Sequence, residues 1–237
     1  MFAEYQAKIN DRAVNNSVYS CGVAALAKLK AGDVKFVDRN GDGVINTDEN
    51  TVGKPGDRYI IGNSLPRYTY SFRGDIDWYG FNLSVFFQGI GHCDWVPPKT
   101  CSYFWSLYGF PASSFVPTDF ESKTWTEDRR NAYFPRRRGY STYSGAALGV
   151  NTDRYLQNAA YIRLKNITLG YTLPIKQNKA VEKVRIYATG ENLWYWSPMK
   201  RHSKYIDPEV ATASSNQSDD CIYPFSRTVS LGIDITF

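Results

Sequence analysis

Apolar and polar residues alternate along several long stretches of this chain, and such alternation predicts half-buried β-strands. In the last twelve residues Val229, Leu231, Ile233, Ile235 and Phe237 alternate with polar or small residues. Four more stretches show the same pattern, at residues 67–78, 81–91, 158–173 and 184–196. Strands of this length exceed the usual five or six residues and are about as long as a bilayer is thick.

The connections between these strands alternate in length. Short ones lie at 79–80 and 174–183, whereas long ones lie before residue 67, at 92–157 and at 197–225. Long loops are uncommon in compact domains, but outer-membrane barrels combine short periplasmic turns with long extracellular loops. The pattern therefore predicts extracellular segments at 33–66, 92–157 and 197–225, and a periplasmic C-terminus.

Aromatic residues, 16 % of the chain, gather where the predicted strands end. In this orientation the outer interface holds Tyr68, Tyr70, Trp194 and Trp196, and the inner interface holds Trp78, Phe81, Tyr171 and Phe237. Two such girdles are typical of barrels in the outer membrane. The alternative from the same pattern is a soluble, calcium-stabilised β-sandwich that binds carbohydrate or adheres to surfaces.

One strand breaks the alternation. In 158–173 the apolar phase of Ile162 and Leu164 differs from that of Ile167 and Leu169, so that Arg163 and Lys165 would face lipid. A β-bulge, or a place at the outer rim, would resolve the conflict. Five strands are also too few to close a barrel, for which about eight are needed, so the sheet belongs to a larger one.

Several motifs resemble the C-terminal part of SusC/RagA-type TonB-linked outer-membrane proteins, in the family's order. They are GDVKFVDRNGDGVI at 32–45, IGNSLP at 61–66, YGFNLSVFFQG at 79–89, AYIRLKNITLGY at 160–171, GENL at 190–193, DPE at 207–209 and IDITF at 233–237. The resemblance implies an all-β fold: an antiparallel meander of about five long strands from a transmembrane barrel of about 22 strands with a plugged lumen. Residues 1–31 match the family poorly.

The same resemblance implies an organisation and a function. Residues 1–31 are an uncertain N-terminal segment, 32–66 an extracellular loop, and 67–237 the C-terminal barrel strands. The family imports oligosaccharides or peptides across the outer membrane together with a SusD-like surface lipoprotein, powered by TonB. The family's plug and TonB-contacting segment have no match here, so this chain alone is not expected to transport. Lumen-facing residues expected to tune passage are Arg73, Asp75, Gln88, Arg185 and Glu191.

Residues 38–49 fit the twelve-residue calcium loop D-x-[DN]-x-[DN]-G-x₅-E without a gap. The expected Ca²⁺ ligands are Asp38, Asn40, Asp42, the Val44 carbonyl, Asn46 (through water) and Glu49. The flanks look extended rather than helical, so the ion would be structural. The alternative is an Asx-rich turn whose side chains bind the loop's own backbone.

Other features are less specific. Cys93 and Cys101 could form a disulfide, leaving Cys21 and Cys221, or the cysteines could be free buried thiols. Loop 92–157 carries aromatics that could stack on sugars, cover a partner or pack on one another; they are Trp95, Tyr103, Phe104, Trp105, Tyr108, Trp125 and Tyr133. It also carries arginines at 129, 130, 136, 137 and 138, which could meet lipopolysaccharide phosphates or an acidic partner, or form a solvated face.

Composition and motif content argue against two classes of function, nucleic-acid binding and enzymatic catalysis. The net charge of +5 is small and dispersed, which argues against nucleic-acid binding. The two histidines, His92 and His202, lie in no catalytic or metal motif, so no enzymatic activity is expected. The first residues carry no signal-peptide pattern, and no apolar run is long enough for a spanning helix.

Overall fold

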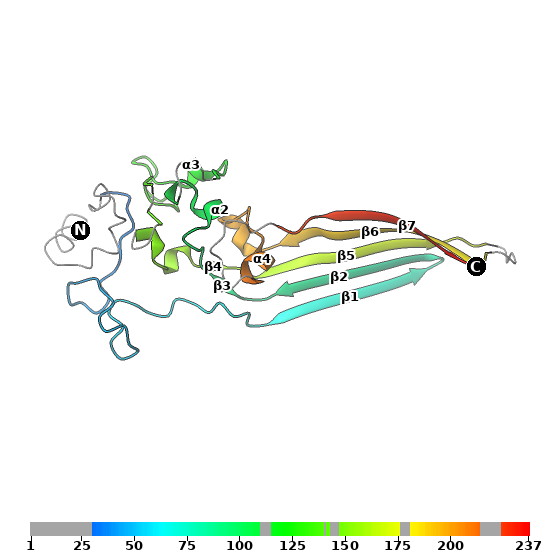
Figure 1. Ribbon diagram of the computed structural model, residues 1–237, viewed down its shortest axis with the longest axis horizontal. Coiled ribbons are helices and arrows are strands. Elements are labelled where there is room, and N and C mark those ends of the chain that lie inside the picture. Colours follow the sequence, from blue (N-terminus) through cyan, green and yellow to red (C-terminus); the bar gives the residue numbers. More distant parts are fainter. Residues whose placement is uncertain (1–29, 110–114, 140, 143–146, 176–180, 214–223) are drawn as a thin grey trace. The chain divides into compact units, whose positions relative to one another are not determined.

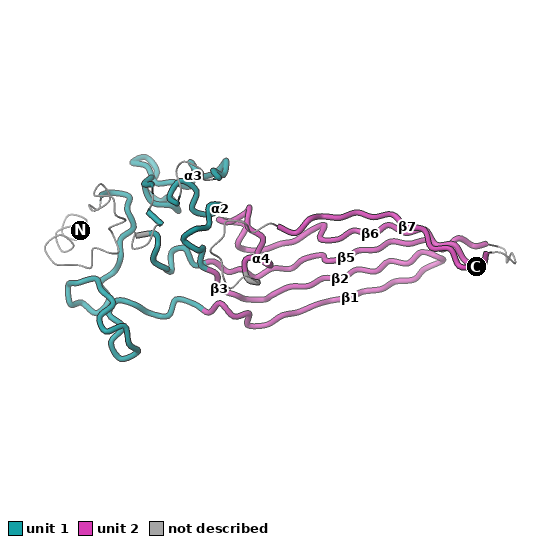
Figure 2. The backbone as a smooth tube through the Cα atoms, in the orientation of Figure 1, with its two compact units in different colours: residues 1–62, 96–156, 216–220 teal, residues 63–95, 157–215, 221–237 magenta. Residues whose placement is uncertain are grey.

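The computed structural model describes residues 30–109, 115–139, 141–142, 147–175, 181–213 and 224–237. The chain divides into two compact units (Figure 2). Unit 1 comprises residues 1–62, 96–156 and 216–220, and unit 2 comprises 63–95, 157–215 and 221–237. The N-terminal segment predicted at 1–31 lies outside the described residues except for its last two.

Unit 2 is built on a five-stranded antiparallel sheet, which confirms the predicted all-β meander (Figure 1). The strands are β1 (Thr69–Trp78), β2 (Phe81–Ile90), β5 (Tyr161–Thr172), β6 (Lys183–Trp196) and β7 (Thr228–Thr236). They pair in the order β1-β2-β5-β6-β7, so each strand lies beside the preceding long strand of the chain. Each begins and ends within three residues of its predicted bounds.

The two ends of this sheet are closed differently. At one end, the turn end, Tyr79 and Gly80 join β1 to β2 with φ angles of 44° and 85°. Two successive positive φ angles match a type I′ hairpin turn. At the other end, the loop end, β3 (Asp94–Trp95) pairs with β4 (Gln157–Asn158), where the longest connection leaves and re-enters unit 2.

The register divides the sheet into an apolar face and a polar face. Phe72 lies opposite Phe87, Val85 opposite Ile167, and Leu169 opposite Ala188. The apolar face comprises Tyr70, Phe72, Gly74, Ile76 and Trp78 of β1, Phe81, Leu83, Val85 and Phe87 of β2, Ile162, Leu164, Ile167, Leu169 and Tyr171 of β5, Val184, Ile186, Ala188, Gly190, Trp194 and Trp196 of β6, and Val229, Leu231, Ile233 and Ile235 of β7.

Among the described residues, no second sheet covers the apolar face. Val229, Leu231 and Ile233 are 72 %, 84 % and 64 % exposed, and Phe72 on β1 is 62 % exposed. A β-sandwich buries these positions between two layers about 10 Å apart. The sandwich alternative is therefore wrong for the described sheet, whose apolar face is open to the surroundings.

A β-bulge brings the out-of-phase residues of β5 back into register. Leu164 lies opposite Phe87 and Asn166 opposite Phe86, so Lys165 is the extra residue. Because one residue is inserted there, Ile162 and Leu164 share the apolar face with Ile167 and Leu169. The bulge continues into β6, where Trp194 pairs with Leu164 but Glu191 pairs with Asn166. One of the two predicted solutions, the bulge, is thus confirmed.

Unit 1 contains short helical segments packed on aromatic side chains. They are α2 (Ser102–Trp105), η3 (Ser106–Tyr108), α3 (Phe120–Lys123), η4 (Ala147–Gly149) and η5 (Asp153–Tyr155). Unit 2 adds η6 (Pro198–Arg201) and α4 (Pro208–Ala213). No helix among the described residues is long and apolar enough to span a membrane.

Candidate functional site

The polar face of the sheet carries paired charges and hydrogen-bonding groups. The Arg73 guanidinium binds Asp75 at 2.9 Å, and Arg185 donates to the side chain of Asn82 at 2.7 Å. Arg185 also lies 3.4 Å from Asp234 and therefore links three strands. The register places Gln88 and Glu191 on the same face, so the residues predicted to face a lumen do share one side of the sheet.

Aromatic side chains mark both ends of the apolar face. At the turn end Trp78 lies opposite Phe81 and Phe81 opposite Tyr171, with the Phe81 and Tyr171 ring centroids 4.5 Å apart. At the loop end the register places Tyr70, Trp194 and Trp196. The clustering predicted from the sequence is thus present in the sheet, and Phe72 and Phe87 add an aromatic pair between the two ends.

A buried ionic cluster occupies the loop end of the polar face. Arg163 pairs with Asp207, and its Nε lies 2.9 Å from Oε2 of Glu209. Lys165 Nζ lies 2.6 Å from Oε1 of the same glutamate. The side chains of Arg163 and Asp207 are each 1 % exposed. Both cations of the bulged segment are therefore neutralised by the Asp-Pro-Glu motif at the start of α4.

Local structure explains why α4 presents its two carboxylates. Asp207 precedes the helix and accepts a 3.0 Å hydrogen bond from the Glu209 amide, as an N-cap residue does. Pro208 occupies the first helical position, where a missing N–H costs no hydrogen bond. The rings of Tyr195 and Phe225 lie 4.7 Å and 5.1 Å from the Arg163 guanidinium. From the sequence, Asp-Pro-Glu is recognisable only as a family motif, and nothing in the spacing marks it as the partner of Arg163.

In the predicted calcium loop, Asp and Asn side chains accept hydrogen bonds from the loop's own backbone amides. Asp38 accepts hydrogen bonds from the Gly41 and Gly43 amides, both at 2.8 Å. Asn40 accepts one from the Asp42 amide, Asp42 from Val44, and Asn46 from Asp48. Glu49 instead forms an ion pair with Lys54 at 2.6 Å. Among the described residues, no three His, Cys, Asp or Glu side chains are placed so that they could hold a metal.

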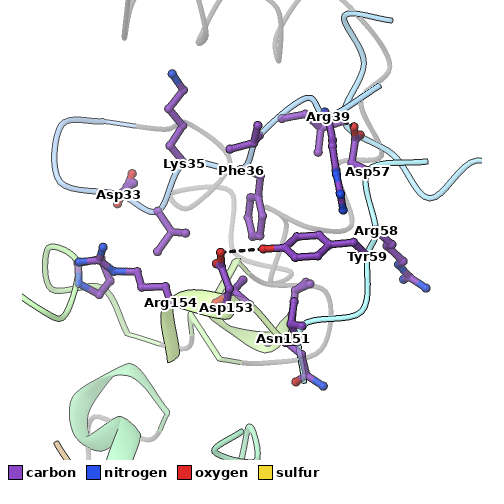
Figure 3. A pocket seen from close by; sticks show the side chains of 18 of the residues that line it. Asp33, Lys35, Phe36, Arg39, Asp57, Arg58, Tyr59, Asn151, Asp153 and Arg154 are labelled. Carbon is purple, nitrogen blue, oxygen red and sulfur yellow. Dashed lines mark hydrogen bonds between the residues drawn. The ribbon is translucent and has the colours of Figure 1, made fainter. Parts of the chain in front are cut away.

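A cavity of about 1500 Å³ lies within unit 1, beside this loop (Figure 3). Phe36, Tyr59 and Asp153 point toward its centre, where the Tyr59 hydroxyl donates a 2.8 Å hydrogen bond to Asp153. That bond raises the pKa of Tyr59, because the carboxylate accepts the phenolic proton. The Arg39 guanidinium stacks 4.3 Å from the Tyr59 ring. No pattern in the sequence predicts this cavity, because its lining comes from segments far apart in the chain.

The aromatic residues of the long connection mostly pack on one another. Phe104, Trp105 and Tyr108 are at most 3 % exposed. They form an aromatic core with Phe120, Tyr133, Phe134 and Tyr155. Burial raises the pKa of Tyr155 to about 12. Of the three roles predicted for these aromatics, self-packing is the one the structure shows for the buried members.

The arginines of this connection are engaged in local contacts. Arg136 and Arg138 both pair with Asp33, at 2.7 and 2.8 Å, and Arg137 pairs with Glu121. Arg129 donates to the backbone carbonyls of Glu121 and Thr124, and Arg130 to that of Glu127. These five arginines therefore make their contacts within unit 1.

The remaining predicted groups are accounted for within the described residues. Cys93 and Cys101 are buried free thiols, so the free-thiol alternative holds for this pair, and Cys93 donates to the Ser64 carbonyl at 3.0 Å. Cys21 and Cys221 lie outside the described residues. His92 lies 3.2 Å from Asp94.

The chain is similar in sequence to known TonB-dependent receptors. The chain is 26 % identical to TonB-dependent receptor P26 of Formosa agariphila over 215 residues, which cover 87 % of this chain and 20 % of that receptor. It is 25 % identical to TonB-dependent receptor SusC of Bacteroides thetaiotaomicron over 211 residues, which cover 85 % of this chain and 17 % of SusC. No family model matches the chain.

The fold of this chain also resembles part of solved structures of the RagAB transporter. The structure of the RagAB peptide transporter superposes with a TM-score of 0.54 and 24 % identity, covering 75 % of this chain and 18 % of that one. The RagAB peptide importer in its closed-closed state gives 0.53 and 23 %, covering 83 % and 20 %. The present chain spans about a fifth of the length of the curated relatives it matches.

A long antiparallel meander with an open apolar face and aromatic residues at both ends is the architecture from which transmembrane β-barrels are built. Within that class, the chain resembles the SusC/RagA-type TonB-dependent receptors, and the similarity covers 17–20 % of the length of each of these relatives.

Proposed function

We propose that this chain forms part of the barrel wall of an outer-membrane TonB-dependent transporter. The observation that carries the proposal is the exposed apolar face, bounded by aromatic residues at both ends. The strands have nine to fourteen residues, so each reaches or exceeds the roughly nine residues that a tilted strand needs to cross the hydrocarbon core. In this arrangement the apolar face contacts lipid and the polar face contacts the lumen.

The edges of the sheet support its place in a larger barrel. Within the described residues, β1 pairs only with β2, and β7 pairs only with β6. Unpaired backbone groups at an edge cannot be satisfied in lipid. Further strands of the same protein would pair with both edges and complete the barrel.

The proposal also assigns the sheet an orientation in the membrane, partner proteins and a cargo. The turn end lies in the periplasm, and the segments around 33–66, 92–157 and 197–225 lie outside the cell, in contact with lipopolysaccharide at the rim. A SusD-like surface lipoprotein covers the barrel, oligosaccharides or peptides are the cargo, and TonB supplies the energy. Support comes from relatives that include SusC and from the likeness to RagAB. Arg73, Asp75, Gln88, Arg185 and Glu191 line the passage.

Two neighbouring substitutions on β2 test which face meets lipid. Val85 and Ser84 are adjacent, but Val85 lies on the apolar face opposite Gly74 and Ile167, whereas Ser84 lies opposite Asp75 and Thr168. An arginine near the bilayer midplane costs about 2–4 kcal/mol. Val85→Arg should therefore reduce the folded fraction in phospholipid vesicles, whereas Ser84→Arg should be tolerated. Equal effects of the two substitutions would contradict the assignment of the faces.

Quenching of tryptophan fluorescence by brominated phospholipids tests membrane contact directly. Trp194 and Trp196 are 50 % and 56 % exposed on the apolar face, and Trp105 is 3 % exposed within unit 1. We expect quenching that falls when Trp194 and Trp196 are both replaced by Phe and persists in Trp105→Phe. A chain that stays monomeric in solution without detergent and shows no quenching would overturn the proposal.

We propose that the loop at 38–49 binds a structural Ca²⁺ ion. Its ligands would be Asp38, Asn40, Asp42, Val44, Asn46 and Glu49. Its support is the turn geometry: Gly41 and Gly43 have φ angles of 76° and 82°, and Asp38 and Asp42 are already oriented by backbone amides. Glu49 would have to exchange Lys54 for the ion. Calorimetric titration should show Ca²⁺ binding that Glu49→Gln abolishes and Glu127→Gln retains; no heat with the unsubstituted chain would refute the site.

A further inference from the structure

The cavity of unit 1 is larger than a typical small-molecule site. Its volume is about 1500 Å³, whereas pockets for small molecules commonly hold roughly 300–1,000 Å³. All of its lining residues belong to unit 1, in the segments 32–62 and 99–154. A cavity of this size within one unit suits a segment of polypeptide better than a single metabolite.

The lining includes apolar side chains that have no cover. Val37, Tyr59 and Ile60 line the cavity and are 71 %, 50 % and 92 % exposed. Val34, Phe36 and Ile61 extend the same surface. Four of these six side chains are aliphatic and gain by burial against apolar side chains, whereas only Phe36 and Tyr59 among them carry a ring on which a sugar could stack. The lining therefore favours a peptide over a carbohydrate.

The charges of the lining are predominantly positive. Six of the lining residues are basic (Lys35, Arg39, Arg58, Lys99, Arg130 and Arg154) and three are acidic (Asp33, Asp57 and Asp153). Figure 3 shows Lys35, Arg58 and Arg154 directed away from the central Tyr59 and Asp153, which places their charges toward the border of the cavity. An apolar floor within a charged border is the usual anatomy of a protein-binding surface.

Each of the three carboxylates already has partners within unit 1. Asp33 pairs with Arg136 and Arg138, which do not line the cavity. Asp57 accepts hydrogen bonds from the Arg39 and Asn46 amides at 2.7 and 2.9 Å. Asp153 accepts the Tyr59 hydroxyl. Only Asp33 is neutralised by cations outside the lining, so the six basic residues of the lining outnumber the two remaining carboxylates and give it a positive field.

We propose that this cavity is a docking site for an acidic peptide segment of a partner protein. Apolar side chains of the segment pack on Phe36, Tyr59 and Ile60, and its carboxylates meet Lys35, Arg58 and Arg154. Electrostatic complementarity of this kind sets specificity and the rate of association. The inference rests on unit 1 alone and does not depend on transport.

Fluorescence anisotropy with the full 237-residue chain in detergent micelles tests the site. The probe is a labelled peptide in which Asp or Glu alternates with Leu or Tyr, and its control carries Asn and Gln at the acidic positions. We expect saturable binding of the acidic peptide, at least about tenfold weaker binding of the amide peptide, and weakening by salt. Equal binding of the two peptides, or no saturable binding, would overturn the proposal.

Two matched pairs of variants locate the binding. Ile60→Ser removes an exposed side chain that lines the cavity, and Val52→Ser removes an equally exposed one that does not. Arg58→Glu reverses a charge of the lining, and Arg227→Glu reverses one in unit 2. The first member of each pair should weaken binding about tenfold and the second should not. Equal losses of affinity within a pair would refute the peptide site. So would displacement of the labelled peptide by oligogalacturonate at a concentration similar to that of unlabelled peptide. Neither result would bear on membrane insertion.

Discussion

Tyr70 lies across Gly89, and its hydroxyl donates a 3.1 Å hydrogen bond to the carbonyl of Tyr161, two strands away. A Cβ atom at Gly89 would lie 2.5 Å from the Tyr70 Cζ and would also overlap the Tyr161 carbonyl oxygen. The glycine is therefore required by the close approach of the ring and of the neighbouring backbone. This contact ties β1, β2 and β5 together at the loop end of the sheet.

Gly89→Ala should displace Tyr70 and break its hydrogen bond to Tyr161. Overpacking of this kind costs about 1–3 kcal/mol. The free energy of unfolding in detergent micelles, measured by denaturant titration, should fall accordingly. Gly74→Ala is the control, because a Cβ atom at Gly74 meets its nearest neighbours at 3.5 Å, an ordinary contact. Equal losses in the two variants would show that Gly89 has no special steric role.

Asp207→Asn should release the segment that follows β6. Removing one partner of a buried ion pair leaves the other charge uncompensated and costs about 3–5 kcal/mol. Arg163, 1 % exposed, would keep only Glu209, which it shares with Lys165, so the buried cluster would carry one uncompensated positive charge. Trypsin should then cleave faster at Lys200, Arg201 and Lys204, and gel electrophoresis with mass spectrometry would identify the cuts.

The matched control for Asp207→Asn is Asp234→Asn. Asp234 lies 3.4 Å from Arg185, but its side chain is 54 % exposed. An exposed pair contributes about 1 kcal/mol or less, so cleavage after Asp234→Asn should match that of the unsubstituted chain. Protection of the segment in both variants would show that the Arg163 cluster does not anchor it.

Asp33→Asn should loosen the turn at residues 30–33 from the rest of unit 1. Its side chain is 7 % exposed and neutralises both Arg136 and Arg138. Loss of that charge should cost about 2–4 kcal/mol, and Trp125 fluorescence should report it because this ring packs against Gly32. Glu121→Gln, which alters the exposed Arg137 pair, should change stability by less than about 1 kcal/mol. An unchanged emission and midpoint in Asp33→Asn would contradict this role.

The strands and their faces could be predicted from the sequence because both depend on local alternation. Val229, Leu231 and Ile233 indicate their face through a period of two, whatever lies on the neighbouring strand. The change of apolar phase around Arg163 and Lys165 can also be detected in the sequence, because a break in the period is itself a local signal. The register in the structure resolves that break with one extra residue.

The side-chain clusters could not be predicted in the same way, because their members are far apart in the sequence. Asp33 and Arg136 are separated by 103 residues, and Lys165 and Glu209 by 44. No periodicity relates such positions, and a charged residue in a loop gives no sign of its partner. The motif at 207–209 marked a position of interest, but only the fold shows that its carboxylates neutralise Arg163 and Lys165.

The calcium loop illustrates an intermediate case. Spacing alone predicts that Asp38, Asn40 and Asp42 act together, and in the structure all three accept hydrogen bonds from backbone amides of the same loop. The same hydrogen bonds are what an Asx-rich turn would make for its own stability. The calcium site and the Asx-rich turn share this backbone geometry. A measurement of Ca²⁺ binding therefore distinguishes them.

The aromatic core of unit 1 should lose stability in alkali. Tyr155 is 2 % exposed, its ring centroid lies 5.0 Å from that of Trp105, and burial raises its pKa to about 12. A tyrosine in the unfolded chain has a pKa of about 10. The folded state therefore holds the phenolic proton more tightly, so this contribution to stability is fully present below about pH 10 and is lost as the pH rises through about 12.

Tyr155→Phe should reduce that alkaline loss by about 2 kcal/mol, because the substituted ring stays neutral at every pH. Burial raises the pKa of Tyr108 and Tyr133 as well, so part of the decline should remain. The measurement is the free energy of unfolding of unit 1, followed by Trp105 and Trp125 fluorescence from about pH 9 to about pH 12. Tyr79→Phe, at an 85 % exposed turn position, should decline as the unsubstituted chain does. An identical pH profile for Tyr155→Phe would show that this ring ionises without opening the core.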